Sequence, residues 1–224
     1  MPQQFLSRDQ VRRIDQRALD EYGLAGIVLM ENAGRGCVEV LCEVGISGPV
    51  LICCGKGNNA GDGFVIARHL DGRGFTPKVL LWCDPYQLRG DAAINYEILS
   101  KTDVPIVACA GRAAGEWLED ELAGADWIVD ALLGTGTVGA PRAPFDSVIE
   151  ALNRHRCKKL SVDLPSGLDC DMGQPAQPTF RAAHTCTFVA AKIGFQSPQA
   201  KDCLGIVHVV DIGVPGRLLH EMQT

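Results

Sequence analysis

The sequence lacks any long apolar run, and this absence excludes the commonest kind of membrane protein. No apolar stretch in its 224 residues reaches the roughly 18 residues that a membrane-spanning helix needs. The first residues, MPQQFLSRDQVRRIDQ, contain no apolar core followed by a small-residue cleavage site, so we expect no signal peptide. Basic residues are outnumbered: 21 Lys and Arg against 27 Asp and Glu give a formal charge of −6. Such a chain is a poor general binder of DNA or of anionic membranes.

The usual spacing of zinc ligands is also missing. The chain has ten cysteines but no C-x-x-C pair, and its five histidines are scattered. Several cysteines lie inside apolar runs such as VLICC and HTCTFVAA. Buried thiols of this kind stay reduced in a reducing compartment, so the cysteine pattern predicts a cytoplasmic protein.

What the sequence does contain is a regular alternation of short apolar strands with helical stretches. Ser7 and Gln10 match a capping box at the start of a first helix, and a second helix follows near Ile27. The later strands are apolar on both faces, as in a parallel sheet covered by helices. The expected strands are VLICC, KVLLW, VPIVAC, DWIVDALL, KLSVDL, TCTFVAA and GIVHVVDI, and the expected helices are Gly63 to Leu70, Asp91 to Leu99, Gly115 to Leu122 and Phe145 to Asn153.

This order predicts one domain over residues 1–224 with a Rossmann-like three-layer αβα sandwich. The central sheet should be mostly parallel and preceded by two N-terminal helices, with the last two strands at one side. Ligands of open α/β sheets bind beyond the carboxyl ends of the strands. The residues that follow each strand are therefore the first candidates for a functional site.

The loop GKGNNAGDG follows the first of these strands. Its Gly55, Gly57 and Ala60 satisfy G-x-G-x-x-A, and Asp84 follows the next strand at about the distance of a ribose-binding acid. These features are typical of a dinucleotide-binding dehydrogenase, although glycines at this spacing also make a plain tight turn. Lys56 precedes Gly57 instead of Ser or Thr, so the loop is not a Walker motif.

The centre of the same loop carries two asparagines. The amide oxygens of Asn58 and Asn59 can coordinate a hard cation, while their NH2 groups can donate to a phosphate. Asp62 stands at the expected start of the following helix, where we expect it to act as the N-cap.

The loop GTGTVGAP follows the strand DWIVDALL, which ends near a carboxylate. A buried acid is costly without a partner, so Asp130 should either bind backbone amides of the following turn or coordinate a cation. Gly134, Thr135, Gly136 and Gly139 then form a compact loop whose free N–H groups can wrap a phosphate or a ribose.

Two further strand ends carry ionisable or hydroxyl groups. Asp163 leaves the strand KLSV, Pro165 stiffens the turn, and Ser166 is outside any G-x-S-x-G motif and suits coordination better than nucleophilic attack. The alternative is an ordinary capped turn. Lys192 follows TCTFVAA and either snorkels to solvent or acts on an anionic group.

Taken together, GKGNNAGDGFVIARHL, VDALLGTG, VDLPSGLDCDMG and the N-terminal LMENAG resemble the NAD(P)H-hydrate epimerases, the YjeF N-terminal domain family. The order and spacing of the motifs agree over nearly the whole chain. The family loop usually reads G-N-N-G-G-D-G, and Ala60 replaces its first inner glycine, which we expect to be tolerated if this position has a negative φ. Thr137 stands where relatives often have leucine.

The resemblance implies an isomerase of nicotinamide nucleotide repair. Its reaction is the interconversion of the R and S forms of hydrated NADH and NADPH (NADHX and NADPHX), which are 6-hydroxy-tetrahydronicotinamide nucleotides. In relatives the S form then passes to an ATP- or ADP-dependent dehydratase, sometimes a fused C-terminal domain for which this chain is too short. The resemblance also implies a homodimer, one K⁺ per subunit, and no nucleic-acid or membrane partner.

Site residues are carried over by position from the same motifs. Epimerisation requires either that the hydroxyl group leaves and returns on the other face or that the ring opens and recloses, and both routes need one proton given and one proton taken. Asp163 is therefore our candidate proton shuttle, and Lys192 is the candidate for its electrostatic partner. The nucleotide is the substrate, so no separate NAD cofactor is implied. The resemblance makes Asn59, Asp130 and Ser166 the potassium ligands, and it makes Asn58, Asn59, Ala60, Gly61, Asp62, Gly134, Thr135, Gly136, Thr137, Val138, Gly139, Ala140 and Asp163 the substrate site.

Two other functions compete with this one. An NAD(P)-dependent oxidoreductase would use G-x-G-x-x-A conventionally, but Tyr22, Tyr86 and Tyr96 are not at the relevant strand ends and no Y-x-x-x-K occurs. A non-catalytic nucleotide-binding or dimerisation module would have no need to keep the potassium ligands and Asp163 together. Both features favour a working epimerase.

Overall fold

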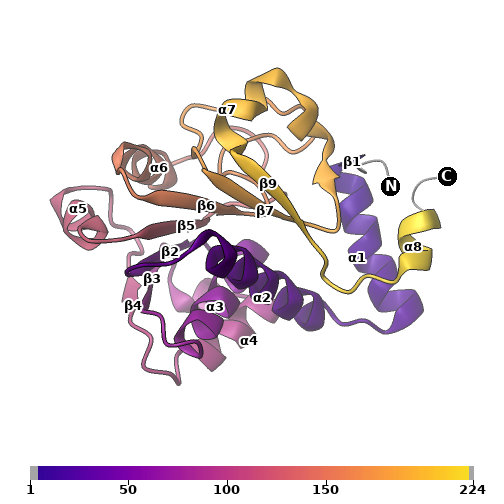
Figure 1. Cartoon of the computed structure of the whole chain (residues 1–224), viewed down its shortest axis with the longest axis horizontal. Coiled ribbons are helices and arrows are strands. Elements are labelled where there is room, and N and C mark those ends of the chain that lie inside the picture. Colours follow the sequence, from indigo (N-terminus) through magenta and orange to yellow (C-terminus); the bar gives the residue numbers. More distant parts are fainter. Residues whose placement is uncertain (1–4, 222–224) are drawn as a thin grey trace.

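A seven-stranded parallel sheet forms the centre of the molecule in the computed structural model, which describes residues 5–221 (Figure 1). The strand order is β4–β3–β2–β5–β6–β7–β9, and every neighbouring pair runs parallel. The predicted α/β fold is confirmed. The strands are β2 (Val50–Cys54), β3 (Pro77–Leu81), β4 (Ile106–Ala108), β5 (Trp127–Ala131), β6 (Lys158–Val162), β7 (His184–Phe188) and β9 (Ile206–Val210).

The sheet is covered by helices on both faces, and β2 shows how the sequence achieves this. All five of its residues are buried. Val50, Ile52 and Cys54 belong to one hydrophobic cluster, whereas Leu51 and Cys53 belong to another. Because successive side chains of a strand point to opposite faces, a continuous apolar run can feed two cores at once.

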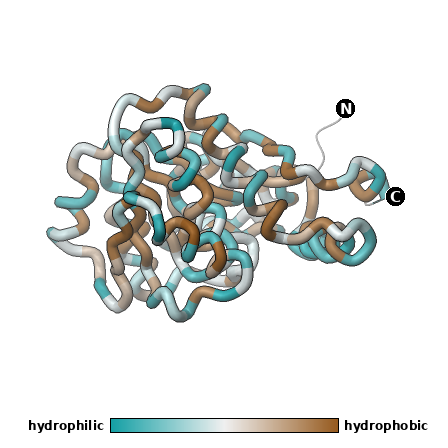
Figure 2. Tube along the Cα trace, turned by 90° about the horizontal axis from the view of Figure 1, so that it is seen from below, coloured by the Kyte–Doolittle hydropathy of each residue, from teal (hydrophilic) through white to brown (hydrophobic). Residues whose placement is uncertain are grey.

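One face of the sheet is covered by α2 (Gly26–Val44), α3 (Asn58–Asp71) and α4 (Gly90–Leu99), and the other by α5 (Glu116–Leu122) and α6 (Phe145–Arg154). α1 (Arg8–Tyr22) and α8 (Gly216–Glu221) lie together at the end of the molecule where both termini lie (Figure 2). The remaining helical segments are η1 (Pro85–Gln87), η2 (Ile193–Gln196), η3 (Pro198–Ala200) and α7 (Lys201–Leu204).

The first helix begins as its sequence predicts. Ser7 Oγ accepts a hydrogen bond from Gln10 N (3.2 Å), and Gln10 Oε1 accepts one from Ser7 N (2.8 Å), so the capping box is confirmed. The helix ends at Gly23, which adopts the left-handed conformation with φ 66°.

A second, two-stranded sheet was not predicted. β1 (Phe5–Leu6) pairs in parallel with β8 (Ala191–Lys192), so that Leu6 lies opposite Lys192. Two-residue strands carry no readable alternation, which explains why the sequence did not reveal them. This pairing fixes the start of α1 beside the end of β7, almost two hundred residues along the chain, and so brings the N-terminal helix to the edge of the sheet where ligands bind.

β2 is the point at which the chain changes the side of the sheet to which it adds strands. β3 and β4 extend the sheet on one side of β2, and β5, β6, β7 and β9 extend it on the other. The last two strands of the main sheet lie together at one side, as predicted. A crevice forms at such a switch point, outside the carboxyl ends of the two central strands. The loops that follow β2 and β5 lie at this switch point.

The cysteines are free thiols throughout the described residues. Eight of the ten are buried and two are half-buried. Burial raises the pKa of the Cys109 and Cys170 thiols to about 11, which keeps them protonated and unreactive at neutral pH. Within residues 5–221, no helix combines the length and the apolar character that crossing a membrane requires.

Candidate active site

Three strand ends meet at the switch point because glycine allows close backbone approach. A Cβ atom on Gly55, the first residue after β2, would lie 2.1 Å from the carbonyl oxygen of Leu132 after β5. No side chain fits there. Gly55 N instead donates a hydrogen bond to Ala131 O (3.1 Å), which holds the two loops against each other.

The asparagine-rich segment is the start of a helix and not a loop. α3 begins at Asn58, and its N-cap is Gly57, which offers no side chain to the orphan N–H groups. The prediction that Asp62 caps this helix is wrong, because Asp62 lies in its second turn. Ala60 is helical and buried and has a negative φ, so the condition on which we expect this substitution to be tolerated is met.

Asn59 connects the segment that follows β2, here called the first loop (GKGNNAGDG), to the second loop, which follows β5 and includes Leu133 and GTGTVGAP. Its Nδ2 donates to Leu133 O at 3.2 Å, and its Oδ1 is buried without a hydrogen-bond partner among the described residues. A buried acceptor left unpaired in this way costs free energy unless something outside the chain satisfies it. Asn58, in contrast, is exposed.

Asp130 connects the second loop to the third loop, which follows β6 and begins with DLPSGLDCD. It is fully buried at the end of β5, accepts hydrogen bonds from Ser166 N (2.8 Å) and Ser166 Oγ (2.7 Å), and also accepts one from Leu132 N (3.2 Å). Burial raises the pKa of Asp130 to about 6, and the hydrogen bonds from Ser166 oppose that rise. The expected binding of backbone amides is therefore present, and it does not exclude coordination.

Ser166 completes this chain of contacts. Its Oγ accepts a hydrogen bond from Leu133 N at 2.9 Å, so Ser166 contacts both the carboxylate of Asp130 and the residue that Asn59 binds. The three predicted potassium ligands thus come together, linked through Leu133. Hard cations prefer amide, hydroxyl and carboxylate oxygens as ligand atoms. The Oδ1 of Asn59 has no hydrogen-bond partner among the described residues, so it is free to act as such a ligand. The side chains present fit a potassium ion.

Asp163 and Lys192 form a buried ion pair. Lys192 Nζ lies 2.9 Å from Asp163 Oδ1, and the lysine has no exposed surface. The expectation that Lys192 snorkels to solvent is excluded. The angles of this contact are not those of a hydrogen bond, and Oδ1 has no aligned donor among the described residues. Lys192 Nζ instead donates to Phe188 O at 3.1 Å.

The backbone at Asp163 is unusual as well. Its φ is 67°, a left-handed conformation that few residues other than glycine, asparagine and aspartate adopt. Asp163 N donates to Cys186 O at 2.7 Å, so the end of β7 holds this turn in place. A strained backbone beneath a buried charged pair is typical of a functional position.

Two more carboxyl groups interact with this pair. Asp62 is buried on α3, and its pKa is raised well above the ordinary range by burial and then by the charges of Asp163 and Asp15. Asp15 comes from α1, and burial and Asp163 raise its pKa to about 6 against the lowering effect of Lys192. Asp15 is nevertheless an exposed residue, so water weakens its interaction with the pair.

Sequence reasoning missed Asp15. It is one acidic residue among several on an amphipathic helix, and nothing in its local pattern distinguishes it from Asp20. Only the pairing of β1 with β8 brings its helix to the site. The predicted site residues Asn58 to Asp62 and Asp163 do belong to elements that meet at this edge of the sheet.

A cavity of about 250 Å³ lies between the second and third loops. Four residues of the predicted substrate loop line it, and Thr135, Gly136 and Val138 are not among its lining. Val138 and Met172 are exposed apolar side chains near its mouth. Neither Asp163 nor Lys192 is among the residues that line the cavity, although Leu164, the neighbour of Asp163, is. From the substrate loop it is lined by Gly134, Thr137, Gly139 and Ala140, and from the third loop mainly by Leu164, Pro165, Gly167, Leu168, Asp169 and Met172.

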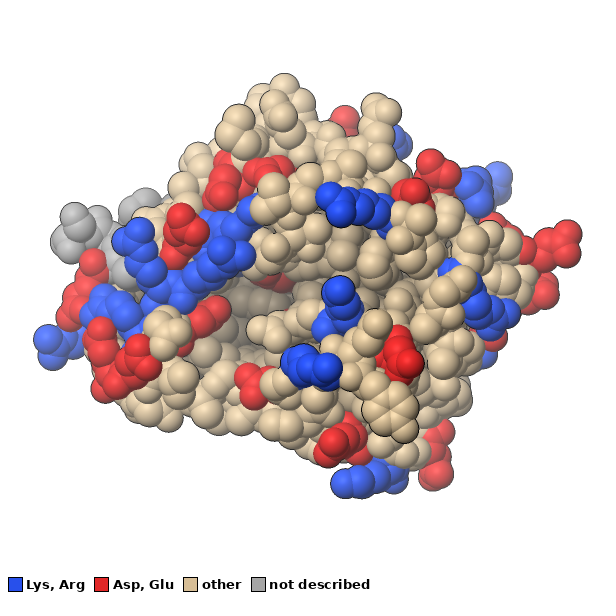
Figure 3. Space-filling view, turned by 180° about the vertical axis from the view of Figure 1, so that it is seen from behind, with Lys and Arg blue, Asp and Glu red and all other residues tan. Residues whose placement is uncertain are grey.

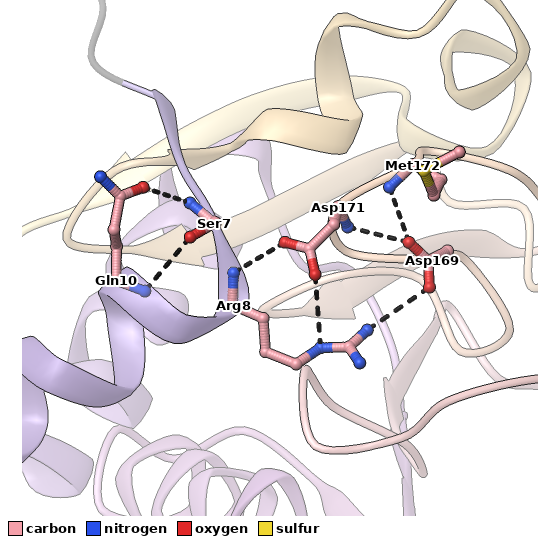
Figure 4. A network of polar contacts seen from close by, with 6 residues as sticks. All are labelled: Ser7, Arg8, Gln10, Asp169, Asp171 and Met172. Atoms are coloured by element: carbon pink, nitrogen blue, oxygen red, sulfur yellow. Dashed lines mark hydrogen bonds and ion pairs between the residues drawn. The ribbon is translucent and has the colours of Figure 1, made fainter.

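The N-terminal segment holds one wall of this cavity (Figure 4). Arg8 N donates to Asp171 Oδ1 at 2.8 Å, and the Arg8 guanidinium lies 3.5 Å from Asp169 Oδ2. Asp169 Oδ1 in turn accepts hydrogen bonds from the backbone N–H groups of Asp171 and Met172. Residues more than 160 positions apart in sequence therefore fix the turn that includes Asp169 and Met172.

The surface view agrees with a site for an anionic ligand with an acidic floor. One face of the molecule is hollowed, with acidic atoms visible inside the hollow and basic side chains, interspersed with acidic ones, around it (Figure 3). Basic groups at a rim attract an anionic ligand, and a recessed acidic group has reduced access to water.

The residues that resemble a dinucleotide-binding motif have structural roles instead. Asp84, the expected ribose-binding acid, caps η1 by accepting a hydrogen bond from Tyr86 N at 3.0 Å. Gly55 serves the close approach of two strand ends, and Gly57 caps α3. Among the described residues, no group of three or more His, Cys, Asp and Glu could hold a metal ion.

Comparison with known proteins agrees with this arrangement of loops. The family described as YjeF-related protein N-terminus matches residues 26–194. The chain is 44% identical over 221 residues to the NAD(P)H-hydrate epimerase of Pirellula staleyi, covering 99% of this chain and 97% of that protein. It is 42% identical over 215 residues to the NAD(P)H-hydrate epimerase of Rhodopirellula baltica, covering 96% of this chain and 86% of that protein.

Two further similarities concern domain organisation and fold. The bifunctional NAD(P)H-hydrate repair enzyme of Moorella thermoacetica is 40% identical over 215 residues, which cover 94% of this chain and 40% of that enzyme. The crystal structure of yeast YNL200c superimposes with a TM-score of 0.81 at 24% identity, covering 99% of this chain and 94% of that one, and so shares the fold. The chain belongs to the YjeF N-terminal domain family and, within it, to the NAD(P)H-hydrate epimerases, which are isomerases.

Proposed function

We propose that this chain interconverts the R and S forms of hydrated NADH and NADPH at the carboxyl edge of its sheet. The observation that carries the proposal is the near full-length similarity to two NAD(P)H-hydrate epimerases at 44% and 42% identity. The buried Asp163–Lys192 pair supports the proposal, because it is an ionisable pair that follows strands of the same sheet.

The elements at the switch point suit a dinucleotide. The first N–H groups of α3 have no side-chain cap, and a helix N-terminus with free N–H groups attracts phosphate. The glycine-rich loop 134–140 faces the neighbouring cavity. We therefore assign substrate binding to Asn58–Asp62, to Gly134–Ala140 and to Asp163, as the family resemblance implies.

Epimerisation at the hydroxyl-bearing carbon transfers protons and no electrons to an external acceptor. Asp163 is our proton shuttle. Lys192 stabilises its carboxylate charge, and the unaligned contact between them leaves an Oδ1 lone pair available. Lys192 is fully buried, so its role is electrostatic.

A potassium ion fits beside this pair. Asn59, Asp130 and Ser166 would hold one K⁺ per subunit, and the buried Oδ1 of Asn59 is the donor that lacks any partner within the described residues. The ion would supply a fixed positive charge that ties three strand ends together. Its contribution would be the positioning of loops.

The proposed partners follow from the relatives. A separate dehydratase that acts on the S form would consume the product, because the Moorella enzyme is bifunctional and this chain spans about two-fifths of its length. We also propose a homodimer by family resemblance, and residence in the cytoplasm, which the free thiols support.

The experiment that tests this function uses a stereospecific reporter. Purified protein is mixed with R-NADHX and a dehydratase that accepts only the S form, and the return of NADH is followed by absorbance. We expect NADH to appear at a rate proportional to the concentration of this protein. If the rate equals that of the dehydratase alone, the proposed function is wrong.

A further inference from the structure

Lys56 is an unpaired cation just before the start of α3. It is the second residue after β2, it is exposed, and its ammonium group makes no hydrogen bond or ion pair with any residue in the described range 5–221. Asp84, which comes after the neighbouring strand β3, accepts a hydrogen bond from Tyr86 N and does not pair with this lysine. Lys56 also lies outside residues 58–62, to which the family resemblance gives a role in substrate binding.

The backbone around Lys56 carries unused hydrogen-bond donors. The N–H groups of residues 56–59 donate no hydrogen bond within the described part of the chain, whereas the next one, Ala60 N, donates to Gly57 O at 3.0 Å. Gly57 is the N-cap and offers these donors no side chain, and a Cβ atom at Gly57 would meet only open space. Consecutive N–H groups with room in front of them suit an anion with several oxygen atoms.

The charge of Lys56 is unfavourable for the helix that it precedes. A helix N-terminus carries a partial positive charge, so acidic side chains stabilise it and basic side chains do not. The first turn of α3 contains no acidic residue, and Asp62 comes only in the second turn. Lys56 therefore does not serve the stability of the helix, and an anion from outside the chain would remove the repulsion.

An independent feature of the same turn also indicates a ligand. Asn59 is 7% exposed, and its Oδ1 is buried without a hydrogen-bond partner among the described residues. Its Nδ2 donates to Leu133 O at 3.2 Å, which fixes the direction of the amide group. The first turn of α3 thus has unsatisfied backbone donors and an unsatisfied side-chain acceptor, and such groups normally find partners.

We propose that Lys56 is a further substrate-binding residue, whose ammonium group binds the pyrophosphate of the hydrated dinucleotide. This assignment rests on the proposed function. NADHX and NADPHX share a pyrophosphate with two negative charges. The N–H groups of residues 56–59 would bind its oxygen atoms, and Lys56 would neutralise part of its charge. Lysine suits this task because its charge lies at the end of a flexible stem that can follow the phosphate oxygens.

The test measures the kinetics of Lys56→Met with NADHX and, separately, with NADPHX in the coupled epimerisation assay. We expect KM to rise about five- to tenfold with kcat unchanged, because a phosphate contact away from the reacting carbon binds substrate and transition state equally. The rise should be the same for both substrates, since both contain the pyrophosphate. Lys56→Arg keeps the charge and should keep KM within about twofold of wild type.

Salt dependence and stability distinguish a phosphate contact from a structural role. Raising the NaCl concentration at constant KCl should increase the KM of wild type more steeply than that of Lys56→Met. Without nucleotide, Lys56→Met should unfold at the same temperature as wild type or higher, because the charge it removes opposes the helix dipole. Lys101→Met is the matched control, since Lys101 is exposed beyond the end of α4 and its side chain has no partner among the described residues. It should leave KM and its salt dependence unchanged.

Calorimetric titration with ADP-ribose tests the contact without the reaction. ADP-ribose contains the pyrophosphate and lacks the hydrated ring, so Lys56→Met should weaken its Kd by about the same factor as it raises KM. A wild type that does not epimerise but binds ADP-ribose through Lys56 would contradict the proposed function and leave the anion site standing. A wild type that does neither would overturn both.

Two results would overturn the role of Lys56 while the proposed function stands. One is a Lys56→Met variant with the KM and the Kd of wild type. The other is a rise in KM confined to NADPHX, which would place Lys56 at the 2′-phosphate and not at the pyrophosphate.

Discussion

Lys192 Nζ lies 2.9 Å from Asp163 Oδ1 at the carboxyl edge of the sheet, and the lysine is wholly buried. The two residues come from different strand ends, and Lys192 is held there by the pairing of β8 with the N-terminal strand. A buried charge is tolerated when an opposite charge accompanies it. The pair is therefore both a structural requirement of this edge and the feature around which the proposed chemistry is arranged.

Replacing Lys192 by methionine should destabilise the protein strongly. The variant leaves Asp163 charged and without its partner, and breaking one side of a buried pair costs roughly 3–5 kcal/mol. Urea unfolding gives the free energy directly. The double variant Lys192→Met with Asp163→Asn should recover much of the loss, and Lys158→Met, at an exposed end of β6, is the matched control. A single variant as stable as wild type would contradict the account of the pair.

Potassium should stabilise the protein through Asn59. At a K⁺ concentration tenfold above Kd, binding to the native state alone adds about 1.4 kcal/mol. We expect a higher melting temperature in KCl than in LiCl at equal ionic strength, and a higher epimerisation rate. Asn59→Ala should abolish this difference, because the unpaired Oδ1 is removed.

The exposed neighbour Asn58 provides the matched control for potassium binding. Asn58→Ala should keep the difference in melting temperature between the two salts. Equal melting temperatures of the wild type in KCl and LiCl would count against a potassium site.

Arg8 should act on substrate binding from a distance. Arg8→Met removes the contact with Asp169 and loosens the turn that bears Met172 at the cavity wall. The guanidinium contacts are long, so we expect a loss of about 1 kcal/mol or less, seen as a KM increase of up to about fivefold with kcat unchanged.

Two variants complete the test of Arg8. Arg8→Lys should restore part of the KM, and Arg12→Met, exposed on the same helix, should have no effect. An unchanged KM in Arg8→Met, or a fall in kcat alone, would show that the contact does not shape the binding site.

Asp15 should make the protein less stable as the pH rises from about 4 to 6. Its folded-state pKa is raised from 3.8 to about 6, so the native state binds more protons than the unfolded state in this window, and the free energy of unfolding falls as pH increases. Asp15→Asn should flatten this part of the curve and raise stability at pH 7. Because the side chain contacts water, the gain should be no more than about 1 kcal/mol.

Urea unfolding at several pH values measures the effect of Asp15. Asp20→Asn, exposed on the same helix, should leave the slope between pH 4 and 6 unchanged. A wild type whose stability rises over this window, with Asp15→Asn following the same curve, would refute the interaction with Asp163.

The sequence predicts the seven-stranded sheet well, because its central strands are runs of apolar residues that are buried on both faces. It misplaces the start of α3, predicted at Gly63 and found at Asn58. Two asparagines and four glycines within the nine residues GKGNNAGDG have the composition of a loop, whereas tertiary packing imposes a helix. A Cβ on Gly63 would meet Cys54 Sγ at 2.6 Å, so this glycine allows close packing of the helix against the sheet.

The residues of the site could be named from the sequence, but their partners could not. Asn59, Asp130 and Ser166 each follow or end a strand, and the parallel sheet brings such positions together. The contact of Lys192 with Asp163 spans 29 positions, and that of Arg8 with Asp169 spans 161. Such contacts depend on the docking of the N-terminal strand, which carries no local pattern. The role of Asp15 depends on the same docking.

The most direct test of the account is the epimerisation rate of wild type and of Asp163→Asn with R-NADHX and an S-specific dehydratase. Asparagine also tolerates the left-handed backbone at this position, so the variant should fold. We predict that wild type returns NADH in proportion to its concentration and that Asp163→Asn does so at least about 100-fold more slowly. A folded Asp163→Asn variant with near wild-type turnover would contradict the central claim.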